Sequence, residues 1–131
     1  MRWRSAQTAL ICALLSGGPL DAWAGSDAER GEEQFRRHCA LCHGLDARGD
    51  GPLGAAMKII PTDLTLLAGR NKGEFPSTRV ADVIRNGGGV LGHGSSAMLA
   101  WGTYFAERRH PEVAKARISE LVSYIKSLQQ K

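Results

Sequence analysis

The stretch "HCALCHG", residues 38–44, decides how this sequence is interpreted. It contains two cysteines, Cys39 and Cys42, three positions apart, and His43 directly follows the second one. Residues three and four apart share one face of a helical turn. Two sulfur atoms and an imidazole are therefore expected at one edge of the chain, where they either hold a group or react with each other.

Three chemistries use cysteines at this spacing. A thiol–disulfide redox pair normally belongs to a βαβ scaffold, and no strand pattern precedes this motif. A structural zinc site needs four ligands, usually from two paired clusters, but there is no second cysteine pair, and His38, His93 and His110 are scattered along the chain. Covalent haem c attachment has the signature C-x-x-C-H, in which both thiols add to haem vinyl groups and the histidine coordinates iron. The motif favours this third chemistry.

The first 24 residues are typical of a secretory signal peptide. Two arginines precede a mostly apolar run over residues 6–16, and "AWA", residues 22–24, offers the small side chains that a signal peptidase recognises. The apolar run is shorter than the about 20 residues that a membrane-spanning helix needs. We therefore predict that residues 1–24 are a cleaved signal peptide and that residues 25–131 form one periplasmic domain with no membrane span. Export agrees with haem c, which bacteria attach outside the cytoplasm.

Charge and composition narrow the function further. The chain carries 17 Lys and Arg against 13 Asp and Glu, a formal net charge of +4, of which the predicted signal peptide contributes +1. The basic residues are not clustered with aromatic ones, so no nucleic-acid partner is expected. Glycines number 16 and aromatic residues make up only 6%. A mature chain of this size buries a modest core, which suggests that a porphyrin supplies part of the apolar interior.

The clearest predicted helices are the first and the last. Ser26 begins the first, because Glu29 follows at the spacing of a capping box, and this helix should run through the cysteine motif and end near Gly44. Pro111 suits the first turn of the last helix. One apolar stripe steps along that helix by four and three residues: Ala114, Ile118, Leu121, Ile125 and Leu128.

The middle of the chain predicts short elements and long loops. Residues 55–60 suggest one helical turn, and a short helix is expected over residues 77–86, with Ser77 as its N-cap and Gly87 as a left-handed C-cap. The sequence predicts a long loop over residues 87–102, and a long loop in a compact domain is usually functional. No segment alternates in the manner of a strand, so the predicted fold class is all-α.

The iron of such a haem needs a second axial ligand. Met98 lies on the long loop, 55 residues after His43, and its thioether would favour ferrous iron and raise the reduction potential. His93, five residues earlier, is the main alternative and would give a lower potential. Met57 is better explained as a core residue, and His110 as a solvated one. We predict Met98 as the second ligand.

The sequence resembles the class I bacterial c-type cytochromes over essentially the whole mature chain. The resemblance rests on "GEEQFRRHCALCHG", "GDGPLG", "PTDLT", "MLAWG" and "ISELVSYIKSL". It implies a cytochrome c-like fold in which the N- and C-terminal helices cross and long loops wrap a haem. In this family a glycine and an aromatic residue on the first helix meet a leucine and an aromatic residue on the last; Gly31, Phe35, Leu121 and Tyr124 match that pattern.

The resemblance also implies roles for single residues. Cys39 and Cys42 would form the thioethers to one covalent haem c, and His43 and Met98 would be the axial ligands of its iron. The carbonyl of Pro52 falls where such proteins often accept a hydrogen bond from the proximal imidazole, a contact that orients the ring and raises its basicity.

Two residues near the expected distal ligand complete the comparison with the family. Trp101 would pack near the haem edge. Leu99 departs from the family, which often has proline after the distal methionine. Because proline stiffens a loop, its absence would make the bond between Met98 and iron easier to displace.

The function predicted from the sequence is non-enzymatic, one-electron transfer in a respiratory chain. The expected partners are a donor dehydrogenase or quinol-oxidising complex and an acceptor oxidase or reductase. A haem c subunit of a larger periplasmic dehydrogenase or oxidase complex is the main alternative. A ligand-binding haem sensor and a thiol oxidoreductase are further alternatives.

Overall fold

The computed structural model describes residues 25–57, 60–88, 98–106 and 110–130. These residues form helices joined by loops, with no β-strand among them, so the predicted all-α class is confirmed. The predicted cleavage site after Ala24 and the alternative ligand His93 lie outside the described residues. The elements are α1 (Asp27–His38), α2 (Ala40–His43), α3 (Ser77–Asn86), α4 (Trp101–Phe105) and α5 (Pro111–Ser127), with 3-10 turns η2 (Gly54–Ala56), η3 (Leu64–Leu66) and η4 (Gly69–Asn71).

Helix α1 begins as its sequence predicts. The Ser26 hydroxyl accepts from the Glu29 backbone N–H at 3.3 Å, and the Ser26 N–H donates to the Glu29 carboxylate at 2.6 Å. Such a cap contributes about 1 kcal/mol to helix stability. The expected run to Gly44 holds with one interruption, because Cys39 ends α1 and begins α2.

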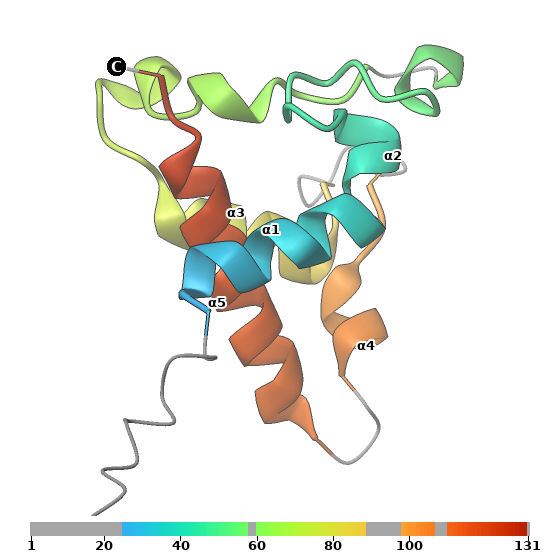
Figure 1. The fold of residues 1–131 in the computed structure, drawn as a ribbon, viewed down its shortest axis with the longest axis vertical. Coiled ribbons are helices and arrows are strands. Elements are labelled where there is room, and N and C mark those ends of the chain that lie inside the picture. Colours follow the sequence, from blue (N-terminus) through green and yellow to red (C-terminus); the bar gives the residue numbers. More distant parts are fainter. Residues whose placement is uncertain (1–24, 58–59, 89–97, 107–109, 131) are drawn as a thin grey trace, which may run out of the picture.

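The crossing of α1 and α5 organises the molecule (Figure 1). Gly31 lies at the crossing point, where an added Cβ would meet the Glu120 carbonyl oxygen at 2.0 Å and the Tyr124 Cβ at 2.9 Å. One turn along α1, the ring of Phe35 packs against that of Tyr124 with 5.3 Å between centroids. The predicted meeting of Gly31 and Phe35 with Leu121 and Tyr124 is therefore supported, since all four are buried.

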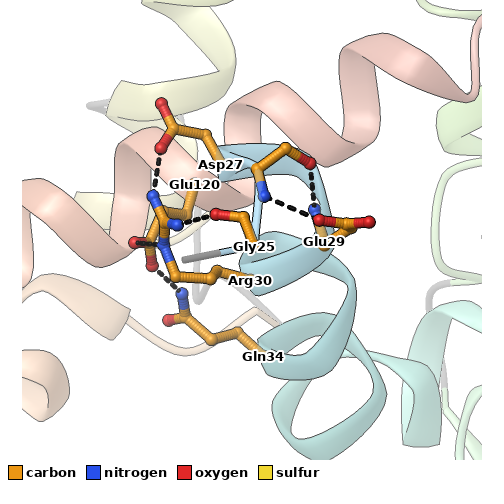
Figure 2. A network of polar contacts seen from close by, with 7 residues as sticks. Gly25, Asp27, Glu29, Arg30, Gln34 and Glu120 are labelled. Carbon is orange, nitrogen blue, oxygen red and sulfur yellow. Dashed lines mark hydrogen bonds and ion pairs between the residues drawn. The ribbon is translucent and has the colours of Figure 1, made fainter. Parts of the chain in front are cut away.

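Polar contacts fix the rotation of α1 on α5 at this crossing. In Figure 2 the Glu120 carboxylate of α5 faces Arg30 and Gln34 of α1. It accepts one hydrogen bond from the Arg30 Nε, at 2.7 Å, and another from the Gln34 side-chain amide, at 2.5 Å. Arg30 also contacts the Gly25 carbonyl and the Asp27 carboxylate. Exposed ion pairs contribute little on their own. The Glu120 side chain is only 18% exposed, however, so this pair is better shielded from solvent and salt than the others on α1.

The hydrophobic core joins all the longer helices. Its most deeply buried side chains are Phe35, Phe105, Ile118 and Leu121. Burying each of them stabilises the fold by about 1.5–3 kcal/mol. The predicted stripe on α5 is buried along its length except for Leu128, which caps the helix and is half-buried.

Two details of α3 differ from the prediction. Ser77 is the first residue of the helix rather than its cap, and Pro76 takes the N-cap position without a side-chain hydrogen bond. Gly87 has the expected positive φ of 83°, but its ψ of 162° is extended rather than left-handed helical. The chain therefore leaves α3 in an extended direction instead of turning back over the last carbonyls.

The long loop predicted over residues 87–102 ends early. Trp101 and Gly102 are the first residues of α4. Trp101, Tyr104 and Phe105 have i, i+3 and i+4 spacing, so a single turn places all three on one face. Phe105 is buried by this arrangement and Trp101 is half-buried, which explains why such a short helix forms.

Gly31→Ala should destabilise the fold, because the added methyl group has to displace the backbone of α5. Overpacking of this kind costs about 1–3 kcal/mol, which thermal or urea unfolding will measure. Gly69→Ala is the matched control, since a Cβ at Gly69 meets nothing within 4 Å. Equal stability of the two variants would contradict the close crossing.

Candidate functional site

The cysteine motif forms one compact turn at the end of α1. The backbone N–H groups of Cys42 and His43 both donate to the Cys39 carbonyl, at 3.1 and 2.9 Å. Cys39, Cys42 and His43 are all half-buried, and neither cysteine forms a disulfide. The structure thus brings together the three residues that the sequence singled out.

The following loop folds back under this turn. The Gly51 N–H donates to the Cys42 carbonyl at 3.2 Å, and the Gly49 N–H donates to the His43 carbonyl at 2.7 Å. These bonds satisfy carbonyls that the short helix α2 leaves unpaired. Gly51 is required at this point, because a Cβ there would lie 2.6 Å from the carbonyl oxygens of both Leu41 and Cys42.

The orientation of the His43 ring is fixed by a backbone carbonyl. Its Nδ1 lies 3.1 Å from the Thr62 carbonyl oxygen. A carbonyl can only accept, so Nδ1 carries the hydrogen and Nε2 keeps a free lone pair. Burial lowers the pKa of His43 below its ordinary value, partly offset by the bond to Thr62. The ring is therefore neutral at pH 7, which is the form that binds a metal through Nε2.

The partner of the His43 imidazole differs from the one that the family pattern suggested. The expected acceptor was the Pro52 carbonyl, but the structure places the Thr62 carbonyl there instead. Two residues beyond Thr62, the Leu64 N–H donates to the Ala47 carbonyl at 2.8 Å. Ala47 is fully buried and adopts a positive φ of 60°. This bond ties the Thr62 segment to the loop that follows the cysteine motif.

The thiol of Cys39 is not poised for disulfide chemistry. Burial, together with the neighbouring Cys42 thiol, raises the pKa of Cys39 to about 12. Catalytic redox cysteines have a lowered pKa because the thiolate is the reactive form. The described part of the chain also contains no group of three or more His, Cys, Asp or Glu side chains arranged to hold a metal ion. The raised pKa disfavours Cys39 as the reactive thiolate of a thiol–disulfide pair.

Met98 reaches the same core from another segment. It lies three residues before α4, is half-buried, and packs against the hydrophobic cluster that Cys39 also contacts. Of its rivals, Met57 is half-buried directly after η2. His110 is exposed, with its Nδ1 2.9 Å from the Glu112 carboxylate.

An aromatic cluster connects the two segments, and the sequence did not predict it. The ring of His38, the residue before Cys39, lies 5.4–5.6 Å from those of Trp101, Tyr104 and Phe105. Burial first, and then the positive charges of Arg117 and Arg37, lower the pKa of His38. The only sequence signals for this contact were the position of His38 and the aromatic spacing in α4.

The sequence matches the cytochrome c family over residues 28–129, which includes the cysteine motif, Met98, α5 and all but the first residue of α1. The chain belongs to the cytochrome c family. The predicted recognition, fold and cofactor are thereby confirmed, since members of this family covalently bind haem c, an iron porphyrin, and transfer electrons. No curated protein matches the chain.

The residues of this cytochrome fit the group that the family binds. Two free thiols share one turn with a neutral imidazole whose Nδ1 is already engaged, so the remaining nitrogen is available to iron. The carbonyl that engages Nδ1 also fixes the tautomer that haem iron requires. None of the described helices of this cytochrome is long and apolar enough to cross a lipid bilayer.

Gly51→Ala should distort the turn that carries Cys42 and His43, because the new methyl group cannot fit beside the Leu41 and Cys42 carbonyls. We expect a loss of about 1–3 kcal/mol in unfolding free energy, together with less haem per polypeptide by visible absorbance. Gly69→Ala should change neither quantity. Full haem loading and wild-type stability in Gly51→Ala would contradict the close approach.

Proposed function

We propose that this cytochrome is a periplasmic, mono-haem, one-electron carrier of a respiratory chain. Cys39 and Cys42 would hold the haem through thioethers, and His43 and Met98 would bind its iron. The observation that carries this proposal is the contact of the His43 Nδ1 with the Thr62 carbonyl, on the same turn as two free thiols.

Each of these side chains has a separate task. The two thiols would hold the haem covalently, each through a thioether to one of its vinyl groups, with the thiol hydrogen passing to the neighbouring vinyl carbon. The Thr62 carbonyl makes the imidazole of His43 more basic, which favours ferric iron. The thioether of Met98 acts in the opposite direction and raises the potential. When bound, the haem iron supplies the ferric–ferrous couple.

The proposed partners follow from this task. A carrier accepts an electron from a dehydrogenase or quinol-oxidising complex and delivers it to an oxidase or reductase. If His43 and Met98 both bind the iron, no substrate would reach it, and the chain itself would transfer electrons without catalysing a reaction. The protein's contribution is to bind the cofactor, tune its potential and present a surface to the partners.

Replacing the cysteines tests the attachment. Cys39→Ser combined with Cys42→Ser should remove all covalent haem, measured as the mass of the denatured polypeptide and its visible absorbance after acid extraction. The wild-type protein should keep its haem under the same treatment. A wild-type chain without the added mass of haem would overturn the proposed function.

Replacing the methionine tests the distal ligand. Met98→Ala should lower the midpoint potential and allow carbon monoxide to bind the reduced protein, because the iron loses a thioether and gains an open position. Met57→Ala is the matched control and should leave both properties unchanged. An unaltered potential and spectrum in Met98→Ala would transfer the ligand role to another residue, with His93 tested next.

Export is proposed from the first 24 residues alone. Fractionation of cells that express the full chain should place the haem protein in the periplasm, and sequencing of its N-terminus should begin at Gly25. Retention of residues 1–24 in the purified protein would contradict both cleavage and the proposed domain boundary.

A haem subunit of a larger periplasmic enzyme complex is the second candidate. It is favoured by exposed apolar side chains near the cysteine motif: Leu41, Leu45 and Leu53 are 58%, 64% and 45% exposed. Leu41 and Leu45 line a shallow groove of about 630 Å³ beside α1 and α2. Isolation under mild conditions distinguishes the two, because a carrier elutes alone and a subunit elutes with its catalytic partner.

A further inference from the structure

We infer that the two glutamines after α5, Gln129 and Gln130, are positioning residues for the proximal histidine. Together they clamp the segment 64–68, which Asp63 alone separates from Thr62, and so set the strength of the bond between the Thr62 carbonyl and His43. This inference rests on the proposed function, in which His43 is an axial ligand of the haem iron.

Both the nitrogen and the oxygen of the Gln129 side-chain amide form hydrogen bonds. Its Nε2 donates to the Leu64 carbonyl at 2.7 Å and to the Ile125 carbonyl at 2.8 Å, and its Oε1 accepts from the Ala68 N–H at 2.8 Å. Two acceptors face one end of the amide and a donor faces the other, so the orientation of the group is determined by its partners. One amide thus joins the last turn of α5 to both ends of the segment 64–68.

Gln130 adds two further bonds to the same segment. Its backbone N–H donates to the Thr65 carbonyl at 3.0 Å, and its side chain donates to the Thr65 hydroxyl at 3.1 Å. Thr65 is a buried polar residue, 6% exposed. Its hydroxyl donates in turn to the Asp63 carboxylate at 2.7 Å, and the same carboxylate accepts from the Thr65 N–H at 2.9 Å.

These hydrogen bonds hold the residues that immediately follow Thr62 in the chain. Asp63 adjoins Thr62, and both backbone groups of the next residue, Leu64, are hydrogen-bonded. The Leu64 N–H donates to the Ala47 carbonyl, and the Leu64 carbonyl accepts from Gln129. The carbonyl of Thr62 therefore has little freedom to turn away from His43. In Figure 1 the end of α5 lies beside the green and yellow-green segment that carries η3 and η4, as these bonds require.

The strength of the hydrogen bond between His43 and Thr62 changes the midpoint potential in a defined direction. A strong bond from Nδ1 to a carbonyl raises the basicity of the ligating imidazole, which stabilises ferric iron and lowers the potential. Loosening the clamp should weaken that bond. The midpoint potential should then rise, and the Nδ1–H of His43 should exchange faster with solvent.

The test uses the intact, haem-loaded protein. Gln129→Met keeps the length of the side chain and adds no charge, but it removes the amide that donates to the Leu64 and Ile125 carbonyls and accepts from the Ala68 N–H. We expect a higher midpoint potential in voltammetry. The His43 Nδ1–H, observed by NMR in the reduced state, should exchange roughly tenfold faster, the factor expected for losing one or two ordinary hydrogen bonds. Gln130→Ala should give a smaller change in the same direction.

Gln34→Ala is the matched control. It also removes a glutamine that bonds to α5, through Glu120, but it does not touch the segment 64–68. It should lower the melting temperature without moving the potential or the exchange rate. If Gln129→Met does not accumulate, Gln130→Ala decides the question by the same two measurements.

Two results would overturn the clamp. One is an unchanged potential and exchange rate in the glutamine variants, with haem fully loaded. The other is an equal shift in Gln34→Ala, which would mean that general loosening of α5 is responsible. Failure of the proposed function is distinguishable from both, because the wild-type protein would then carry no covalent haem.

Discussion

The close approach of α1 to α5 at Gly31 is the constraint on which the rest of the structure depends. Backbone meets backbone there, so the ring of Phe35 reaches Tyr124, and Glu120 reaches Arg30 and Gln34. The cysteine motif begins at the end of the same helix. Its position relative to α5 is therefore set by a contact between the two helices about two turns before the motif begins.

The site itself is built mainly by backbone groups. Carbonyls of the motif accept from the loop that follows it, and the Thr62 carbonyl accepts from His43. Side chains provide the sulfur and the imidazole, but main-chain hydrogen bonds determine where these atoms lie. This division explains why glycine is needed at position 51, where any side chain would displace two carbonyls.

The predictions from sequence succeeded where the signal is local and periodic. The capping box at Ser26 and the apolar stripe of α5 follow from spacing that the residues themselves carry, whereas the meeting of Gly31 with Tyr124 was implied by the resemblance to the family. The Thr62 carbonyl was missed because every residue has a carbonyl, and only the path of the chain shows which one faces the ring. The cap of α3 was wrong for a similar reason, since Pro76 precedes Ser77 and takes the N-cap position. The roles of the cysteines, His43 and Met98 stay predictions.

The aromatic cluster suggests how the distal segment is held without the proline that often follows the ligand in this family. Leu99 is 69% exposed and does not anchor the chain. Two residues later, Trp101 begins α4 and packs both on Phe105, with 5.5 Å between ring centroids, and on His38. Because His38 directly precedes Cys39, this contact ties the segment after Met98 to the start of the cysteine motif. Packing between rings thus supplies a restraint that a proline would otherwise provide through its fixed backbone angle.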